Sequence, residues 1–499
     1  MSQSPERAAP TPPLRRSLEQ FRAPARRRPL PALEIAAVAI VGVHLVFLPW
    51  AIGGMPVWAQ IASAALAVAG FVVALIPRAP RDDTGSPAGI AMWPRLIAFP
   101  VFWIGLALLG YITAQALNPA WVFRSDAANF WMERIPHLEW LPAGVSAPFD
   151  RWNPWRSLLV YGSAWLTLCT VWVACTRRRS LQLLLIALVA NGVLLAAFGV
   201  LQKLTGTAKL YWSLPSPSLW FFASFVYKNH AAAYLNLALT AAGALAAWYH
   251  VRGLRRHEKS NPAGLFAFFA MGIAVAVLAS YARGATLVMM VLVVGCAAVL
   301  LWHRRAVPAG SRHPAVAFAL LVVFAVFLVT GFRALRSHDA FTHLRQGLTQ
   351  QDRALEVRGV ATAAALEMLA EHRLTGVGAG AFRYLFPIHQ AKHPALTMSL
   401  GERRHWEHAH NDVVQFPIEL GLPGVALGLL ALGYALLTLV RHHFWDHPLG
   451  ACGVLGLLLL PVYAWWDFPF QSPAILITWC ALWPVIALWV KVEELAASD

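Results

Sequence analysis

The sequence predicts an all-α polytopic membrane protein with about twelve transmembrane helices. Hydrophobic residues make up 58% of the 499 positions and charged residues only 13%, and one or two soluble cores could not bury that much apolar surface. Apolar runs of about twenty residues recur along the chain, and each is long enough to cross the hydrocarbon core of a bilayer. Many of the 22 tryptophans stand at the ends of these runs, where amphipathic rings favour the headgroup region.

Basic clusters between the apolar runs predict their orientation. The spans are expected at 33–52, 56–77, 96–116, 157–175, 181–202, 230–250, 264–281, 285–302, 314–332, 420–440, 449–465 and 471–490. If the N-terminus is cytoplasmic, the arginine and lysine clusters all fall on that side, at 26–28, 177–179, 252–259 and 304–305. Twelve crossings return the C-terminus to the cytoplasm, so we expect both termini there.

The segments between the spans differ in length and character. Residues 1–31 are polar and rich in proline and arginine, which predicts a disordered cytoplasmic tail. Two external segments, 117–156 and 333–419, are too long to be simple turns. The longer one lies between spans nine and ten, and it combines helical periodicity over 357–369 with a glycine turn at 376–380.

Composition and patterning argue against several classes of protein. The net charge is +16, but the basic residues form short clusters between apolar runs, which argues against a nucleic-acid partner. The five cysteines lie within or at the edges of apolar runs and suggest neither disulfides nor a metal site. A transporter should bury ionisable residues at mid-span, but the expected spans are largely uncharged. His44 in the first span is the exception, and we expect it to be a packed polar group.

Three external cations break the positive-inside rule. Arg283 ends a tight hairpin between spans seven and eight, Lys228 precedes span six, and Arg358 begins the amphipathic stretch of the long loop. Each has a plain explanation, because arginine and lysine often snorkel to the interface or face solvent. Together they would form a cationic site for a diphosphate, whose oxygens accept charge-assisted bonds from guanidinium.

A histidine-rich segment at 402–412 enters span ten. Three readings are open for its histidines. The two-residue spacing of His408 and His410 would place both on one face of an extended strand, as in a zinc or manganese site, although no familiar ligand spacing accompanies them. The histidines could instead lie beside a helix start capped by Asn411 or Asp412. The third reading is a general base, because the histidine pKa lies near neutrality.

Four blocks of sequence resemble the O-antigen ligase and O-antigen polymerase-related family of bacterial membrane glycosyltransferases (the Wzy-C/O-antigen ligase-like domain). They occur in the family's order, as FVYKNH at 225–230 with AYL at 233–235, SYARG at 280–284, Arg358 followed by RLTGVG at 373–378, and HAHND at 408–412 continuing through ELGLPG at 419–424. The last block is the most specific. Tyr227 stands where the family has asparagine, and Arg373 where it has proline.

The resemblance implies a GT-C-like fold with its site on the periplasmic face of the inner membrane. It implies an inverting, metal-independent glycosyltransferase without cofactors, whose donor is a glycan on undecaprenyl pyrophosphate. His410 maps as the base. Arg283 and Arg358 map as pyrophosphate ligands, with Lys228 as a weaker one. The supporting residues are His408, Asn411 and Glu419, and Glu419 would orient His410 or neutralise the helix entrance.

The resemblance also divides the chain into regions. These are the tail 1–31, an N-terminal transmembrane region 32–190, a catalytic region 191–440 that includes loop 333–419, and C-terminal helices with a short tail at 441–499. The expected activity is ligation of O-antigen to a lipid A core sugar. The alternatives are a polymerase of the same fold, transfer to protein hydroxyls, and a transporter. Ligase and polymerase share the donor and differ in the acceptor, a glycolipid or another glycan.

Overall fold

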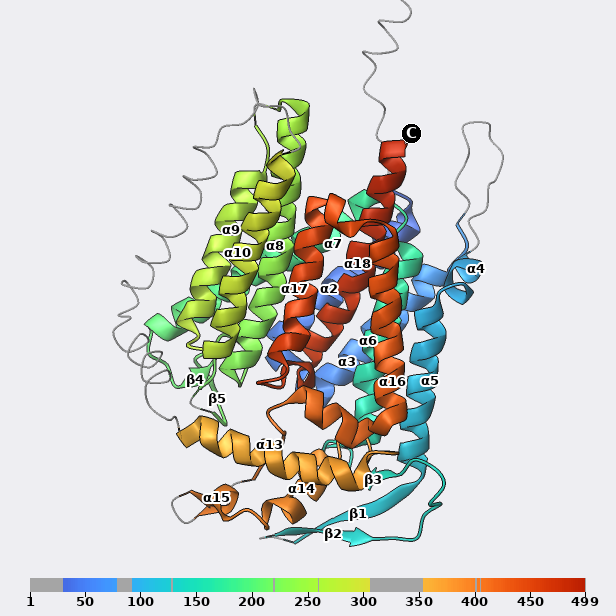
Figure 1. Cartoon of the computed structure of the whole chain (residues 1–499), viewed down its shortest axis with the longest axis vertical. Coiled ribbons are helices and arrows are strands. Elements are labelled where there is room, and N and C mark those ends of the chain that lie inside the picture. Colours follow the sequence, from blue (N-terminus) through green and yellow to red (C-terminus); the bar gives the residue numbers. More distant parts are fainter. Residues whose placement is uncertain are drawn as a thin grey trace, which may run out of the picture.

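The computed structural model describes residues 30–78, 92–126, 129–218, 220–258, 260–305, 353–399, 402–403 and 405–498. Its long helices form a bundle (Figure 1), and they stand where eleven of the expected spans lie. They are α2 (Ala32–Trp50), α3 (Val57–Leu75), α5 (Pro100–Leu117), α6 (Pro154–Ala174), α7 (Arg178–Leu204), α8 (Lys228–Arg256), α9 (Ala263–Ala279), α10 (Arg283–Arg305), α16 (Asp412–Arg441), α17 (Pro448–Tyr463) and α18 (Pro473–Ser498). The expected span 314–332, residues 1–29 of the tail and residues 333–352 of the long loop lie outside the described residues.

The prediction of a polytopic helical membrane protein is confirmed. Within the described residues, nine helices are long and apolar enough to cross a membrane, while α9 and α17 are shorter apolar helices. Helix α8 lies at the centre of the bundle, since 89% of its apolar window is buried, against 11% for α16. Helix α8 itself carries many buried alanines, and such small side chains let neighbouring helices approach closely. His44 packs between Ser63 and Thr167, as expected of a packed polar group.

One end of the bundle gathers the segments expected in the cytoplasm. Glu34, near the start of α2, accepts a hydrogen bond from the backbone N–H of Thr176 in the α6–α7 turn. Arg178 lies over the ring of Trp248 at the end of α8, and Trp248 donates to Glu493 near the end of α18. The described arginines at 177–179 and 252–256 therefore lie at the same end of the molecule as the end of α18 (Figure 1).

The opposite end carries a compact cap, which we define as the described residues within 119–146 and 353–411 (Figure 1). Strands β1 (Pro119–Ser125), β2 (Phe130–Arg134) and β3 (Gly144–Ser146) form a small sheet in the order β2-β1-β3. Beside it lie α13 (Arg353–His372), which covers the stretch expected to be helical, and α14 (Phe382–Gln390) with α15 (Pro394–Thr397). The cap has its own hydrophobic core, to which Val145, Met368, Phe382 and Trp406 contribute.

Short elements complete the described chain. Two-stranded sheets pair β4 (Lys209–Leu210) with β5 (Leu214–Pro215) and β6 (Met398–Ser399) with β7 (Glu402–Arg403). Helix α4 (Met92–Ile97) precedes α5, and single 3-10 turns are η1 (Ile52–Gly54), η3 (Phe444–Asp446) and η4 (Pro469–Gln471). The η4 turn follows Asp467 and Phe468 at the cap end of the bundle.

Two sequence predictions need correction around the histidine segment. Helix α16 extends well before the expected span 420–440, since it begins at Asp412. Its start agrees with the predicted cap, because the Asn411 side chain accepts from the Val414 N–H at 3.2 Å. The helix is then broken at Gly421, whose φ of 62° and ψ of −174° are not helical. Residues 405–411 also form no strand, since His410 adopts a left-handed φ of 52°.

Candidate active site

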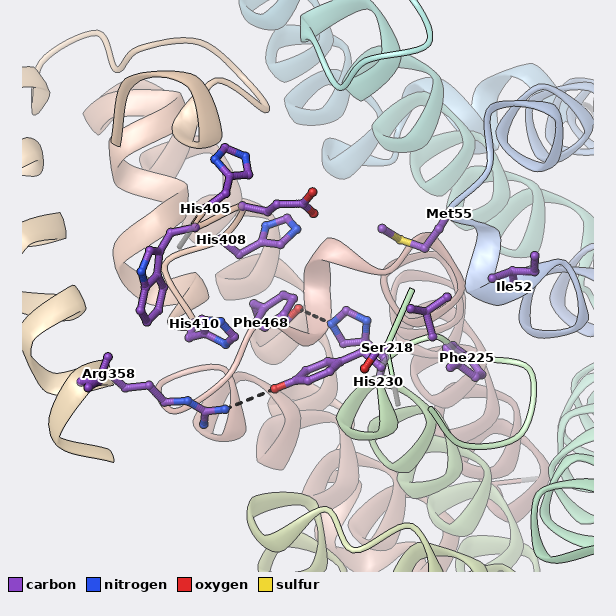
Figure 2. A pocket seen from close by; sticks show the side chains of 15 residues that line it. Ile52, Met55, Ser218, Phe225, His230, Arg358, His405, His408, His410 and Phe468 are labelled. Carbon is purple, nitrogen blue, oxygen red and sulfur yellow. Dashed lines mark hydrogen bonds between the residues drawn. The ribbon is translucent and has the colours of Figure 1, made fainter. Parts of the chain in front are cut away.

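A cavity of about 410 Å³ lies where the cap meets the helix bundle. Residues from five separate parts of the chain line it, among them Met55, Tyr227, Arg358, His408, His410 and Phe468. Figure 2 shows the Arg358 side chain and the imidazoles of His408 and His410 around this space, with Phe468 between the histidines and His230. The cavity therefore unites residues of three of the four sequence blocks, and Phe468 comes from outside all of them.

His410 is held in place by aromatic rings and by the backbone. Its imidazole meets the rings of Phe468 and Trp406 edge to face, with centroids 4.6 and 5.4 Å apart respectively. A left-handed backbone costs a non-glycine residue roughly 1–2 kcal/mol, and such conformations concentrate at functional sites. The Asn411 cap immediately follows and fixes the start of α16, so the position of His410 is strongly constrained.

Arg358 belongs to a hydrogen-bonded group of half-buried side chains that is completed by the buried Asp467. Its Nη2 donates to the Tyr227 hydroxyl at 3.4 Å, and the Asn229 amide donates to the same hydroxyl at 2.8 Å. Asn229 also donates to the carboxylate of Asp467. Burial raises the pKa of Tyr227, so the phenol stays neutral. Burial lowers the pKa of Arg358, but Tyr227 and Asp467 outweigh it and the net shift is upward.

Asp467 accepts two further hydrogen bonds and is only 2% exposed. The Tyr463 hydroxyl donates to it at 2.8 Å and the Phe468 N–H at 2.9 Å. Burial raises the pKa of the Asp467 carboxyl, and the Arg358 charge opposes that shift. The Asp467 carboxylate thus acts on Arg358, which lines the cavity, without lining the cavity itself.

Lys228 and Arg283 stand beside this cavity and do not line it. Lys228 starts α8, and its Nζ lies 4.6 Å from the centroid of the Trp220 ring. The charges of Arg283 and Arg358 both act on it, so the structure brings the three predicted cations together. Three like charges at one membrane boundary repel one another and favour a multiply charged anion between them.

Arg283 is exposed and is presented by the α9–α10 hairpin. Lys203, at the end of α7, donates to the Ala279 carbonyl at 2.6 Å and lies 3.1 Å from the centroid of the Tyr281 ring. Tyr281 itself has a left-handed φ of 56°. A lysine on a terminal helix carbonyl is favourable electrostatically, so Lys203 stabilises the turn that precedes Arg283.

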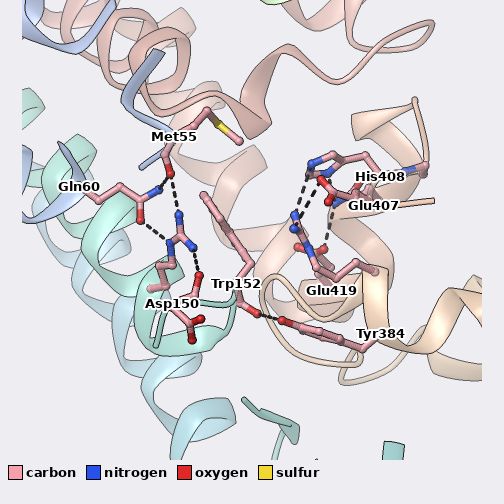
Figure 3. A network of polar contacts seen from close by, with 12 residues as sticks. Met55, Gln60, Asp150, Trp152, Tyr384, Glu407, His408 and Glu419 are labelled. Carbon is pink, nitrogen blue, oxygen red and sulfur yellow. Dashed lines mark hydrogen bonds and ion pairs between the residues drawn. The ribbon is translucent and has the colours of Figure 1, made fainter. Parts of the chain in front are cut away.

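His408 is buried and bound by groups that hold it. Its ring stacks on Phe468, with centroids 4.7 Å apart, while the Gln415 amide and Arg383 guanidinium contact its two nitrogens at 3.3 and 3.4 Å (Figure 3). A neutral imidazole has one acceptor nitrogen, so it accepts from one of these donors at a time. Burial lowers the pKa of His408 well below its usual value, which makes it a neutral neighbour of His410.

Glu419 anchors the glycine turn at 376–380, which we call the glycine loop. It accepts from the Gln415 amide at 3.0 Å and from the Gly380 and Phe382 N–H groups at 2.9 and 3.4 Å. Through Gln415 it is linked to His408, and these contacts are the ones that define its place. Its predicted role in orienting His410 would have to act through this chain of contacts.

Arg383 and Arg156 flank the ring of Trp152. Their guanidinium carbons lie 5.6 and 4.7 Å from the ring centroid. Arg156 also donates to the Met55 carbonyl at 2.6 Å and to the Gln60 side chain at 2.8 Å (Figure 3). Because Met55 lines the cavity, this network ties one wall of the site to α3 and α6.

Sequence reasoning missed Tyr227 as a contact of Arg358, and it missed Asp467, Phe468, Arg383 and Gln415 altogether. One signal was available for Asp467, because an acidic residue between two apolar spans is costly at a membrane boundary and often functional. The metal alternative for His408 and His410 needs more ligands. Within the described residues, the group of three with ligand atoms close together is Glu371, His372 and His389, none of which lines the cavity.

Fold and site together define a polytopic membrane protein with a cationic, histidine-bearing cavity at one end of its helix bundle. Residues 265–429 match the family model described as O-antigen ligase (Wzy_C), over about a third of the chain. This match confirms the predicted resemblance and supports an enzyme of the O-antigen ligase or polymerase type. It includes Arg283, Arg358 and His410, whereas Lys228 lies before it. No curated protein matches the chain.

Proposed function

We propose that this protein transfers a glycan from undecaprenyl pyrophosphate to an acceptor hydroxyl at the periplasmic face of the bacterial inner membrane. The observation that carries the proposal is that His410 and Arg358 line one cavity, beside which Lys228 and Arg283 stand. A diphosphate leaving group needs cations, and an acceptor hydroxyl needs a base. Both requirements are met at the membrane end where a lipid-linked donor would present its headgroup.

In the proposed reaction, the acceptor oxygen attacks the anomeric carbon of the donor sugar while its proton passes to a ring nitrogen of His410. The bond from the anomeric carbon to the phosphate oxygen breaks, and undecaprenyl pyrophosphate leaves with the electron pair. Attack opposite the leaving group inverts the anomeric carbon. Arg358, Arg283 and Lys228 stabilise the charge on the diphosphate, so the reaction proceeds without a metal ion at this position.

The preferred acceptor is a lipid A core sugar, which makes the protein an O-antigen ligase. Polymerisation is the second candidate, because the same cavity and donor serve it and the family match covers both activities. The two differ only in whether the attacking hydroxyl belongs to a core glycolipid or to another lipid-linked glycan. The roles of His408 and Asn411 are to position His410, His408 from its side of Phe468 and Asn411 through the helix cap.

A strain carrying His410→Ala tests the proposal through its surface polysaccharide. For a ligase, the core lipid stays bare while full-length glycan accumulates on its carrier. For a polymerase, the core carries a single repeat unit. The matched control is His393→Ala, which alters a cap histidine that does not line the cavity and should leave the polysaccharide normal. Normal long-chain polysaccharide in the His410→Ala strain would refute the assignment of His410 as base.

A further inference from the structure

The cap carries a second group of ligand side chains, away from the candidate active site. Glu371 and His372 end α13 and His389 lies in α14. Each offers one ligand atom, and the three atoms lie within 4.8 Å of one another. Arg358, the cavity residue on α13, is separated from Glu371 by roughly 20 Å along the helix at the usual rise per residue.

His389 is the most informative member of this group, because its buried imidazole makes no hydrogen bond within the described part of the chain. Its side chain is 4% exposed, and its Nε2 lies 3.7 Å from an oxygen of Glu371, beyond hydrogen-bond reach. Among the described residues no partner faces its Nδ1. Buried polar atoms rarely lack a partner, and an imidazole with an uncommitted lone pair is what a metal ion requires.

We propose that Glu371, His372 and His389 bind a divalent transition-metal ion, with zinc the best match to the ligand types. Two imidazole nitrogens and one carboxylate oxygen form a common zinc ligand set, with a fourth position open to water. Ligand atoms around a tetrahedral zinc stand roughly 3.4 Å apart. The side chain of Glu371 is 54% exposed, so its carboxylate has room to close the remaining gap.

Charges of both signs lie next to this group of ligands. Lys392 lies 3.6 Å from one oxygen of Glu371 and opposes a cation, but His389 faces the other oxygen. Glu367 lies 3.1 Å from His393 and adds negative charge nearby. A bound ion would join the end of α13 to α14. It would thereby brace the two helices that carry Arg358 and Arg383, without contacting the cavity.

Equilibrium dialysis of the purified full-length chain in detergent against zinc chloride tests this proposal. We expect one zinc per wild-type chain in excess of that bound by Glu371→Gln, and a zinc affinity at least tenfold weaker in that variant. Glu371→Gln is the first choice because the residue is exposed and the change should not disturb folding. His389→Asn should give the same loss, and cobalt substitution should give tetrahedral absorption bands only in the wild type.

The matched controls are Glu367→Gln on α13 and His393→Asn between α14 and α15, which alter the neighbouring ion pair and should keep the zinc. Zinc should also raise the midpoint of thermal unfolding of the wild type and of both controls, and leave Glu371→Gln unchanged. Equal zinc content in the wild type and Glu371→Gln would overturn the proposal. So would equal loss in the two control variants, which would indicate diffuse binding by surface histidines. Neither result bears on His410, so the proposed transfer reaction stands or falls separately.

Discussion

Asp467 lies near Arg358 in the candidate active site and accepts hydrogen bonds from neighbouring groups. It accepts from Asn229, Tyr463 and the Phe468 N–H, and its charge acts on Arg358. Asn229 and Arg358 in turn both donate to the Tyr227 hydroxyl. Arg358 is therefore one member of a network, and its position depends on a carboxylate that does not line the cavity itself.

Replacing Asp467 by asparagine should weaken use of the lipid-linked donor while the fold is retained. The amide nitrogen would meet donors where an oxygen now accepts, and Arg358 would lose its counter-charge. A hydrogen bond to a charged group contributes about 1.5–3 kcal/mol, so we expect a fall of roughly 10- to 100-fold in kcat/KM for the donor, mostly through KM. The measurement is transfer kinetics with purified protein at varied donor concentration.

Asp446→Asn is the control for that substitution, since Asp446 is exposed at the other end of the bundle. Donor kinetics equal to wild type in a folded Asp467→Asn protein would show that Arg358 needs no support from this carboxylate. A decrease in kcat with KM unchanged would also contradict the positioning role.

Short motifs predicted part of this site and three-dimensional contacts supplied the rest. Arg358 and His410 could be named because each belongs to a recognisable block with an evident chemical purpose. Tyr227 looked like a departure from the family pattern, yet it bonds Arg358 from 131 positions away. Arg383 and Gln415 have ordinary local surroundings in the sequence, and only folding brings both against His408.

At the scale of single elements, the break in α16 separates a site-forming segment from a lipid-facing one. Val414 and Ile418, before the break, pack in the core of the cap. By contrast, only 11% of the 18-residue apolar window of α16 is buried. The Val377 N–H donates to the Ile418 carbonyl at 2.8 Å, and the Leu422 N–H donates to the Arg373 carbonyl at 3.0 Å. The glycine loop and the broken helix thus share backbone hydrogen bonds across Gly421.

Gly421→Ala should strongly destabilise the protein. Its φ and ψ lie in a region that is essentially confined to glycine, and an added Cβ would stand 2.5 Å from the Leu374 carbonyl oxygen. We expect a loss of at least about 2–3 kcal/mol in unfolding free energy, measured as a lower midpoint of thermal unfolding in detergent.

Gly428→Ala provides the comparison within the same helix. An added Cβ there meets nothing within 4 Å, and alanine is the better helix former by about 0.5–1 kcal/mol. Its stability should equal or slightly exceed wild type. If both variants were equally stable, the close approach of the glycine loop to α16 would not be important for the fold.

For the whole molecule, hydropathy predicted the bundle well and the cap poorly. Spans follow directly from the apolar runs, because the bilayer fixes the length of a crossing helix. The strands β1 to β3 had no comparable signal, since Trp- and Arg-containing segments with short alternation resemble ordinary loops. Their sheet shares a hydrophobic core with α13 and α14, which lie more than 200 positions later in the chain. The expected span 420–440 left out the first turns of α16, which contain Pro417, although the cap at Asn411 was among the predictions.

The cap and the bundle meet at the cavity, where we propose that glycan transfer takes place. Purified full-length protein in lipid nanodiscs should transfer glycan from undecaprenyl pyrophosphate to one of two supplied acceptors, a lipid A core glycolipid or a second lipid-linked glycan. The most direct measurement compares the single-turnover rate of the wild type with that of His410→Ala at saturating donor. We predict a decrease of roughly 10²- to 10⁴-fold, the contribution typical of a general base, with donor binding retained. Transfer by His410→Ala at the wild-type rate would contradict the assignment of His410 as the general base.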